Sequence, residues 1–193
     1  MLSIQNNLET QRLDAQYFSK TNLADHSLTL CPETYTTFEA LGLKLDGSAF
    51  YPSIEPQYGS GDFPFIRVAD VTDILDLSNC ETIPIELMDA YPTLKPVDAG
   101  DLVITKGGSI GRTALVTGRA AACRDLIFIN SSCLKEEEQN FLYLYLQSGI
   151  AQRMLIRSSS QTAHPHLTLT LVRHLPLFKG SKQLQKQCLL TVQ

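Results

Sequence analysis

The stretch DLVITKGGSIGRTALV, residues 101–116, contains two short apolar runs on either side of a turn rich in glycine. Residues 101–106 and residues 113–118 have the length and the branched side chains of β-strands. The glycines between them permit the positive φ angles that tight turns require. The stretch therefore predicts a β-hairpin.

The same turn fits the pattern G-x-S-x-G, in which Ser109 would be the nucleophile of a small serine hydrolase. Asp125 and one of three histidines would complete a triad in the expected order: His164, His166 or His174. A nucleophile elbow needs a helix after the serine, and the run that follows has only six residues before Gly118. A phosphate-binding P-loop also fits poorly, because Lys106 precedes the glycines. The hairpin is the preferred interpretation, with the hydrolase as its rival.

The predicted hairpin carries Lys106, Ser109 and Arg112 at its tip. Two cations, a hydroxyl and exposed backbone amides suit contacts with phosphate oxygens or base edges. A connecting hairpin with solvated charges explains the same residues, so the motif alone does not separate the two interpretations.

Other segments predict a mixture of short helices and strands. Helices are expected over residues 12–20, 32–41 and 140–156, the last with Asn140 as its N-cap, and within 84–96 ahead of a proline-bounded turn. Strands are expected over residues 63–71 and 125–130 and through Leu175 and Leu177, the last after a helical turn capped by Thr168 or Thr170.

Composition places the chain among ordinary globular domains. It has 193 residues, of which 44% are hydrophobic, and no run approaches the roughly 18 apolar residues of a membrane span. The N-terminus lacks the pattern of a secretory signal. Five widely spaced cysteines form no C-x-x-C pair, which favours reduced thiols in a cytoplasmic protein over a structural zinc site.

Charge is divided unevenly along the chain, although the formal net charge is only −4. Residues 1–105 hold five Lys or Arg and sixteen Asp or Glu, whereas residues 106–193 hold eleven and four. Such asymmetry is a hint of nucleic-acid contact. A dipolar surface without a ligand explains the counts as well.

Two polar segments have the composition of binding loops. Residues 46–63 are rich in Gly, Pro and Ser and carry Phe50, Tyr51 and Tyr58, which fits a binding loop or aromatics that pin a loop to the core. The segment RSSSQTAHPH at 157–166 is a run of short polar donors. A solvated connection explains that run equally well, and its His-Pro-His is more typical of a turn than of a metal site.

Five segments occur in an order and spacing typical of one family. They are RLDAQYF, PFIRVADVTD, GDLVITKGGSIGRTALV, NFLYLYLQSGIAQRMLIRSSSQTAHPHLTLTLVRHLPLF and KQLQKQ. Over nearly the whole chain, this order resembles the target-recognition domain of type I restriction-modification specificity subunits.

The resemblance implies an α+β (α/β) domain with a strongly bent, mainly antiparallel sheet and packed helices. It implies that residues 1–178 are the recognition domain and that residues 179–193 begin a conserved spacer helix. Such a domain reads one half of a bipartite DNA site and has no catalytic residues or cofactor. The implied partners are double-stranded DNA, a methyltransferase subunit and a restriction or motor subunit.

The tail has its own apolar pattern. Leu184, Cys188 and Val192 follow one another at spacing four, which predicts a helix that pairs with another helix, from a second copy or a longer partner. A protein-interaction domain that keeps this fold but reads no DNA is the third alternative.

The resemblance also assigns roles to the polar residues. Arg112 is expected to pair with guanine and Gln161 with adenine, because each side chain can form two parallel hydrogen bonds with that base, while Lys106 suits phosphate. The expected DNA-contacting residues are Lys106, Ser109, Arg112, Ser158, Ser159, Ser160, Gln161, Thr162, His164 and Tyr58.

Overall fold

A computed structural model describes residues 20–21, 24, 31, 33–49, 53–72, 75–159 and 166–192, with side chains as far as residue 187. The helix expected over residues 12–20 falls almost wholly outside this part of the chain, as do Phe50 and Tyr51. The described part is α+β and mainly antiparallel, as expected.

The strands form two four-stranded sheets and one two-stranded sheet rather than a single bent sheet. The first sheet has the order β2 (Lys44–Asp46), β9 (Leu126–Asn130), β6 (Leu102–Thr105) and β7 (Thr113–Leu115). The second has the order β4 (Glu81–Ile83), β3 (Phe63–Ile66), β8 (Ala120–Ala122) and β5 (Pro96–Val97). The third joins β1 (Tyr35–Thr36) to β10 (Leu177–Phe178). The pairing of β3 with β8 is parallel, and the other pairings are antiparallel.

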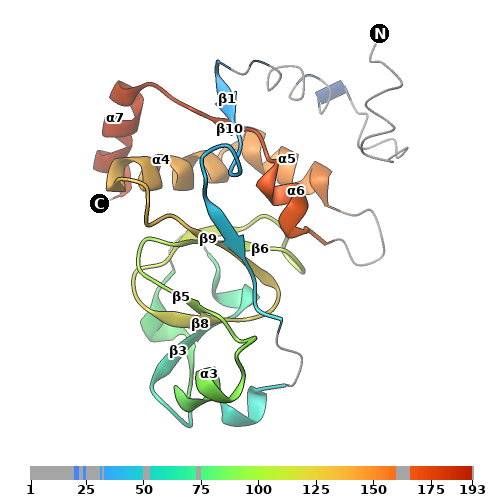
Figure 1. Cartoon of the computed structure of the whole chain (residues 1–193), viewed down its shortest axis with the longest axis vertical. Coiled ribbons are helices and arrows are strands. Elements are labelled where there is room, and N and C mark those ends of the chain that lie inside the picture. Colours follow the sequence, from blue (N-terminus) through green and yellow to red (C-terminus); the bar gives the residue numbers. More distant parts are fainter. Residues whose placement is uncertain are drawn as a thin grey trace.

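The helices gather at one end of the molecule, so that helices, first sheet and second sheet lie one above another (Figure 1). The helical end comprises α4 (Glu136–Gln147), α5 (Gly149–Ser158), α6 (Leu169–Arg173) and α7 (Lys182–Val192). The other helices accompany the second sheet: η1 (Glu55–Gln57), η2 (Val68–Asp70), η3 (Leu77–Asn79) and α3 (Glu86–Ala90).

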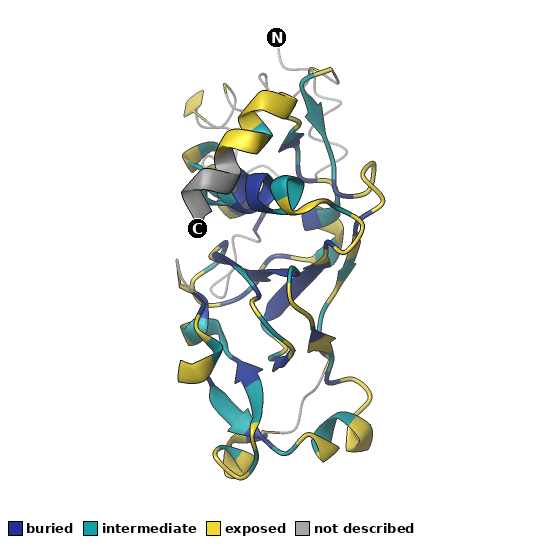
Figure 2. Cartoon of the chain, turned by 90° about the vertical axis from the view of Figure 1, so that its left-hand side faces the viewer, coloured by how far each residue is buried: buried dark blue, intermediate teal, exposed yellow. Residues whose placement is uncertain are grey.

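Strand β6 is buried on both faces, because it lies between the helices and the second sheet (Figure 2). Leu102 and Ile104 point into a core shared with Leu146 and Leu155 of the helices. Val103, on the opposite face, belongs to a core shared with the second sheet. Because successive side chains of a strand point to opposite faces, this one strand contributes side chains to both cores.

The predicted hairpin is confirmed. Strands β6 and β7 pair antiparallel with Val103 opposite Ala114. The strand predicted over residues 125–130 is β9, which pairs with β6. Thr168 caps α6 by accepting a hydrogen bond from the amide of Leu171 at 3.3 Å. The short helix within 84–96 is α3, and the predicted strand at 63–71 ends at Ile66 before η2 begins.

The helix predicted over residues 32–41 is wrong. Tyr35 and Thr36 form β1, which pairs with Phe178 and Leu177. Residues 37–42 then make turns that end at Gly42, whose φ of 70° suits glycine. Pairing with a distant strand overrides the local helical pattern.

The helix predicted over residues 140–156 is two helices. The first begins at Glu136, where Glu138 accepts a hydrogen bond from the Lys135 amide at 2.9 Å, so Lys135 and not Asn140 is the N-cap. Ser148 ends α4 and caps α5 by accepting from the amide of Ala151. The apolar spacing runs through both helices, and the extended backbone of Ser148 separates them.

Candidate nucleic-acid interface

The β6–β7 turn is held in one shape by Thr105, the last residue of β6. The buried Thr105 hydroxyl donates to the carbonyl of Ser109 and accepts from the amide of Arg112 at 3.0 Å. Gly108 and Gly111 have φ angles of 68° and 86°, so each occupies a conformation that favours glycine. The turn therefore holds the exposed residues Ser109 and Arg112 on a fixed backbone.

Three segments distant in sequence meet at the base of this turn. The Lys106 amide donates to the carbonyl of Asp125 at 2.9 Å, and the Lys106 carbonyl accepts from the amide of Leu167 at 2.9 Å. Gly107 is buried beside the ring of His166, where an added Cβ would lie 3.1 Å from the ring carbon Cε1. The hairpin, the β8–β9 turn and the segment before α6 thus form one surface.

The geometry does not support the hydrolase alternative. Ser109 lies in a turn that leads into strand β7, whereas a nucleophile elbow leads into a helix whose amides stabilise the oxyanion. His166 packs beside Gly107, and the hydrogen bonds described for the turn join Ser109 to Thr105 and not to a histidine. The G-x-S-x-G pattern here specifies a hairpin.

Lys106 borders a hollow of 740 Å³ at this meeting point. The half-buried lysine shares its lining with Arg124, Asp125 and His166. Lys106 Nζ lies 3.9 Å from where a Cβ on Gly47 would be, so the ammonium reaches across to the β2 side of the hollow. A lysine at the edge of such a hollow suits an anionic group such as a phosphate.

Arg112 borders a different hollow, of 580 Å³, with Thr72, Gln147 and Gln152. Gln152 donates to the carbonyl of Gly111 at 2.8 Å and to that of Leu146 at 2.7 Å, so it joins the hairpin to the junction of α4 and α5. Planar guanidinium and amide groups are the side chains that form paired hydrogen bonds with purine edges.

Tyr58 borders a third hollow, of 270 Å³, near the second sheet, together with Arg67 and Arg124. Its ring lies 5.9 Å from that of Phe65 and 5.8 Å from the Arg67 guanidinium carbon, so it pins its loop to the core. Burial raises the pKa of the Tyr58 hydroxyl.

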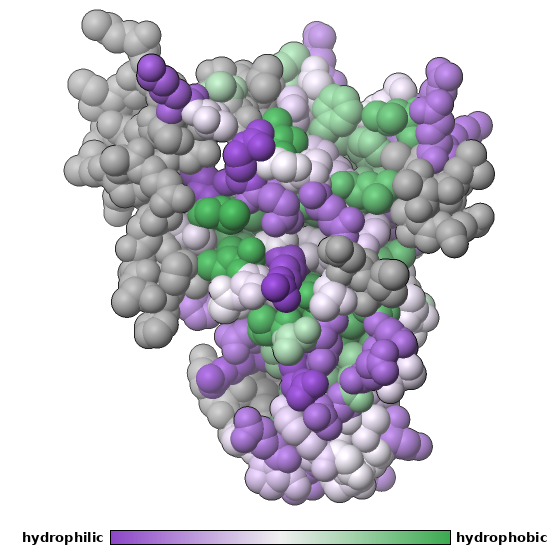
Figure 3. Space-filling view, turned by 180° about the vertical axis from the view of Figure 1, so that it is seen from behind, coloured by the Kyte–Doolittle hydropathy of each residue, from purple (hydrophilic) through white to green (hydrophobic). Residues whose placement is uncertain are grey.

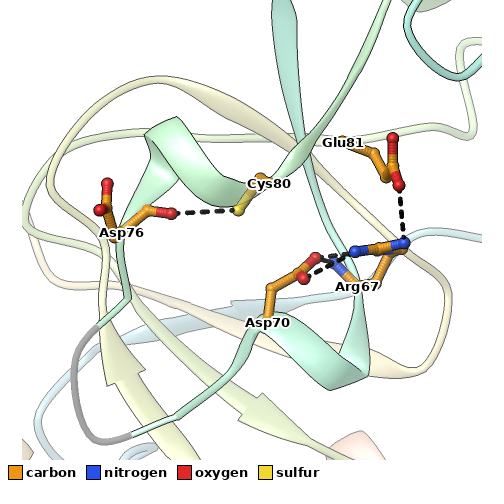
Figure 4. Close-up of polar contacts among 5 residues, drawn as sticks. All are labelled: Arg67, Asp70, Asp76, Cys80 and Glu81. Carbon is orange, nitrogen blue, oxygen red and sulfur yellow. Dashed lines mark hydrogen bonds and ion pairs between the residues drawn. The ribbon is translucent and has the colours of Figure 1, made fainter.

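Arg67 is bound by carboxylates within the protein (Figure 4). Its guanidinium donates to both oxygens of Asp70, at 2.9 and 3.0 Å, and to Glu81 at 3.1 Å. The hydrogen bonds with Asp70 raise the pKa of Arg67 above its ordinary value. Two carboxylates around one guanidinium give this cluster a net negative charge, so Arg67 supports the fold of the second sheet instead of attracting an anion.

The polar run after α5 is only partly described. Ser158 is half-buried at the end of α5. Ser159 is 2% exposed and its hydroxyl donates to the carbonyl of Ile156 at 2.7 Å, so the expected DNA contact from Ser159 conflicts with its burial at the helix C-cap. The remaining residues of this run that were expected to contact DNA lie outside the described part of the chain: Ser160, Gln161, Thr162 and His164.

The cations of the second half are not all on the surface. Arg153 is exposed, with Nη1 3.2 Å from where a Cβ on Gly149 would be, but Arg157 is only 9% exposed. Lys106 and Arg112 border separate hollows. Arg157 therefore adds little to any positive surface that the second half of the chain presents.

The sequence interpretation overlooked Arg124. This arginine lies in the β8–β9 turn, is half-exposed, and borders both the Lys106 hollow and the Tyr58 hollow. Only the pairing of distant segments creates these hollows, so no local motif pointed to it.

From behind, the end of the molecule farthest from the helices is largely hydrophilic, and apolar side chains gather nearer the helices (Figure 3). Among the described residues, no group of three or more His, Cys, Asp or Glu could hold a metal ion. The helices described here are all too short or too polar to cross a membrane.

Comparison with known proteins identifies one family. Residues 46–187 match the family described as type I restriction modification DNA specificity domain. A search of curated proteins found no significant match.

Several solved structures share the fold. The type I restriction-modification S subunit from M. genitalium is 15% identical with a TM-score of 0.52, covering 80% of this chain and 36% of that one. The type IIG restriction endonuclease BpuSI is 9% identical with a TM-score of 0.70, covering 97% and 29%. The HsdS subunit from Thermoanaerobacter tengcongensis is 16% identical with a TM-score of 0.53, covering 97% and 46%. This chain therefore spans less than half of each of these proteins.

Proposed function

The chain belongs to the family of type I restriction modification DNA specificity domains, and from this membership we propose that it reads one half of a bipartite DNA site without catalysing a reaction itself. The observation that carries the proposal is the meeting of the β6–β7 turn, the β8–β9 turn and the segment before α6 on one surface. That surface presents cations and planar donors from a backbone that hydrogen bonds hold in place.

The cations at this surface are of two kinds. This difference supports separate roles, one in positioning the protein on the DNA backbone and one in reading the bases. Lys106 carries a point charge in a hollow and suits a phosphate oxygen. Arg112 is exposed on a fixed turn and has the planar donor pair that recognises guanine O6 and N7. Phosphate contacts set the register of a protein on DNA, and contacts with bases set its sequence preference.

The proposed partners follow from the family. We infer that the chain acts together with a methyltransferase subunit and a restriction or motor subunit, which perform the chemistry. We also propose that residues 179–193, which contain α7, begin a spacer helix that pairs with another helix, from a second copy or from a longer partner. Within this chain α7 packs against α4, and Leu184 on α7 remains 39% exposed, which fits a further pairing.

Selection from a pool of random duplexes tests this function. The chain, alone and in complex with a type I methyltransferase subunit, is immobilised and the bound duplexes are sequenced. A short, gapless motif for this chain supports the proposal. The absence of any enriched motif in both preparations contradicts it, and stoichiometric labelling of Ser109 by a fluorophosphonate would favour the hydrolase instead.

A further inference from the structure

We propose that Arg124, together with Asp125, is a specificity-determining residue that contacts a G·C base pair, with the guanidinium on guanine and the carboxylate on cytosine. This inference rests on the proposed function, because it assumes that the surface around the β6–β7 turn faces duplex DNA. It adds a reading residue that neither the local sequence motifs nor the family match assigns.

The position of Arg124 is fixed by its neighbours. The Cys123 amide donates to the carbonyl of Ile66 at 2.9 Å, which ties the start of the turn to β3. The Asp125 carbonyl accepts from the amide of Lys106 at 2.9 Å, which ties the end of the turn to the hairpin. A reading residue needs such a backbone, because base contacts depend on small displacements.

The shape around Arg124 matches a DNA groove. Arg124 and Asp125 line both the Lys106 hollow and the Tyr58 hollow, so they form the wall between two concave surfaces. A major groove is about 12 Å wide and lies between two protruding phosphate backbones. A wall beside the Lys106 hollow is complementary to that profile, with the wall in the groove and the Lys106 hollow facing one backbone.

The charges favour a base contact over a phosphate contact. Arg124 Nε lies 3.7 Å from Asp125 Oδ2, and the two side chains are 51% and 39% exposed. A carboxylate beside a phosphate would be repelled, whereas a carboxylate in the major groove accepts a hydrogen bond from cytosine N4 while an arginine donates to guanine. An Arg–Asp pair can therefore contact both bases of one G·C pair.

Arg67 borders the Tyr58 hollow too but is a poor candidate. Asp70 and Glu81 bind its guanidinium through three hydrogen bonds of 3.1 Å or less. Releasing it would leave two carboxylates facing DNA. The ion pair of Arg124 with Asp125 is longer and more exposed, so breaking that ion pair costs little.

The test compares Arg124→Ala with Arg119→Ala. Arg119 is a matched control, because it is an exposed arginine with a similar ion pair, 3.6 Å from Nε to Asp98 Oδ1, and lines none of the three hollows. Affinities are measured for the duplex selected by the wild-type chain, for a scrambled duplex, and for duplexes in which each G·C pair is replaced in turn.

Arg124→Ala is expected to reduce the ratio of selected to scrambled affinity by about tenfold. At one G·C position, replacing the base pair should then no longer change the affinity of this variant. Arg119→Ala is expected to keep the wild-type ratio. Arg124→Lys, which keeps the charge and loses the planar fork, is expected to bind scrambled DNA like the wild type and still lose the ratio. Thermal unfolding checks that all three variants fold.

Three results would overturn the inference, and they show whether the proposed function fails with it. If the wild-type chain prefers its selected duplex but Arg124→Ala keeps both the ratio and the same base preferences, this inference is wrong and the proposed function stands. An equal loss of affinity for both duplexes identifies a phosphate contact and also overturns it. If the wild-type ratio is close to one, the proposed function fails, and this inference fails with it.

Discussion

The amide of Lys106 donates a 2.9 Å hydrogen bond to the carbonyl of Asp125, and this bond joins the β6–β7 hairpin to the β8–β9 turn. The two residues also share the lining of one hollow. A single backbone contact thus places a cation from one turn beside the Arg124–Asp125 pair of another.

Lys106 and Arg112 are expected to differ in their effect on DNA binding. Lys106→Ala should weaken binding to every duplex alike and reduce the salt slope by about one counterion, because it removes a phosphate contact. Arg112→Ala should cost about 1–3 kcal/mol on the selected duplex and much less on a scrambled one. Fluorescence anisotropy across a salt series measures both, and identical profiles for the two variants would contradict the division of roles.

Thr105 is expected to stabilise the hairpin through its hydroxyl. Thr105→Val keeps the shape but leaves the amide of Arg112 and the carbonyl of Ser109 without that partner, at a cost of about 1–3 kcal/mol in unfolding free energy. Thr113→Val is the control: the Gly111 carbonyl that its hydroxyl contacts at 3.2 Å also accepts from Gln152. Urea unfolding should show the larger loss for Thr105→Val, and equal losses would mean that the hydroxyl does not hold the turn.

Part of the strand arrangement could be predicted from the sequence. Strands β6, β7 and β9 were predictable because each is a short apolar run between turn residues. Which of their side chains share a core follows from the alternation of side chains along a strand. Strand β8 was missed because its three alanines have little strand preference, and its neighbours β3 and β5 hold it in the sheet. The helix predicted over residues 32–41 failed for a related reason, since β1 pairs with β10 far along the chain.

The candidate site was only partly predictable. The tip residues of the hairpin followed from its turn chemistry, whereas Arg124 acquires its position from hollows lined by three distant segments. Ser159 looked like an exposed donor in a polar run, but the end of α5 buries it. Local composition cannot distinguish a helix cap from a ligand contact.

Gly180 is expected to be irreplaceable where α7 approaches α4. An added Cβ would lie 2.5 Å from Phe141 Cζ, and the φ of 64° is itself unfavourable for other residues. Gly42 has a similar φ of 70° but open space around it. Both alanine variants should lose about 1 kcal/mol from backbone strain, and Gly180→Ala should lose about 1–3 kcal/mol more from the clash. Matching melting temperatures for the two variants would show that the Phe141 ring yields freely.

The cysteines are expected to react at very different rates. Burial raises the pKa of Cys80 and of Cys123 to about 11, whereas the hydrogen bond with Thr34 lowers the pKa of the exposed Cys31. At pH 8 only about one part in a thousand of each of these two thiols is thiolate. Iodoacetamide should therefore modify Cys31 before Cys80 or Cys123. From pH 7 to pH 9 their rates should keep rising about tenfold per pH unit, while that of Cys31 levels off earlier. Peptide mass spectrometry follows each site, and faster labelling of Cys80 or Cys123 than of Cys31 at pH 8 would contradict the assigned environments.

The most direct test of sequence-specific DNA recognition is the ratio of two dissociation constants, one for the duplex selected by this chain and one for the same bases scrambled. The account predicts a ratio of about a thousandfold, the lower end of the range for specific DNA-binding proteins. Both affinities should fall as salt rises, because phosphate contacts are common to the two duplexes. A ratio close to one at every salt concentration, with the methyltransferase partner present, would contradict the account.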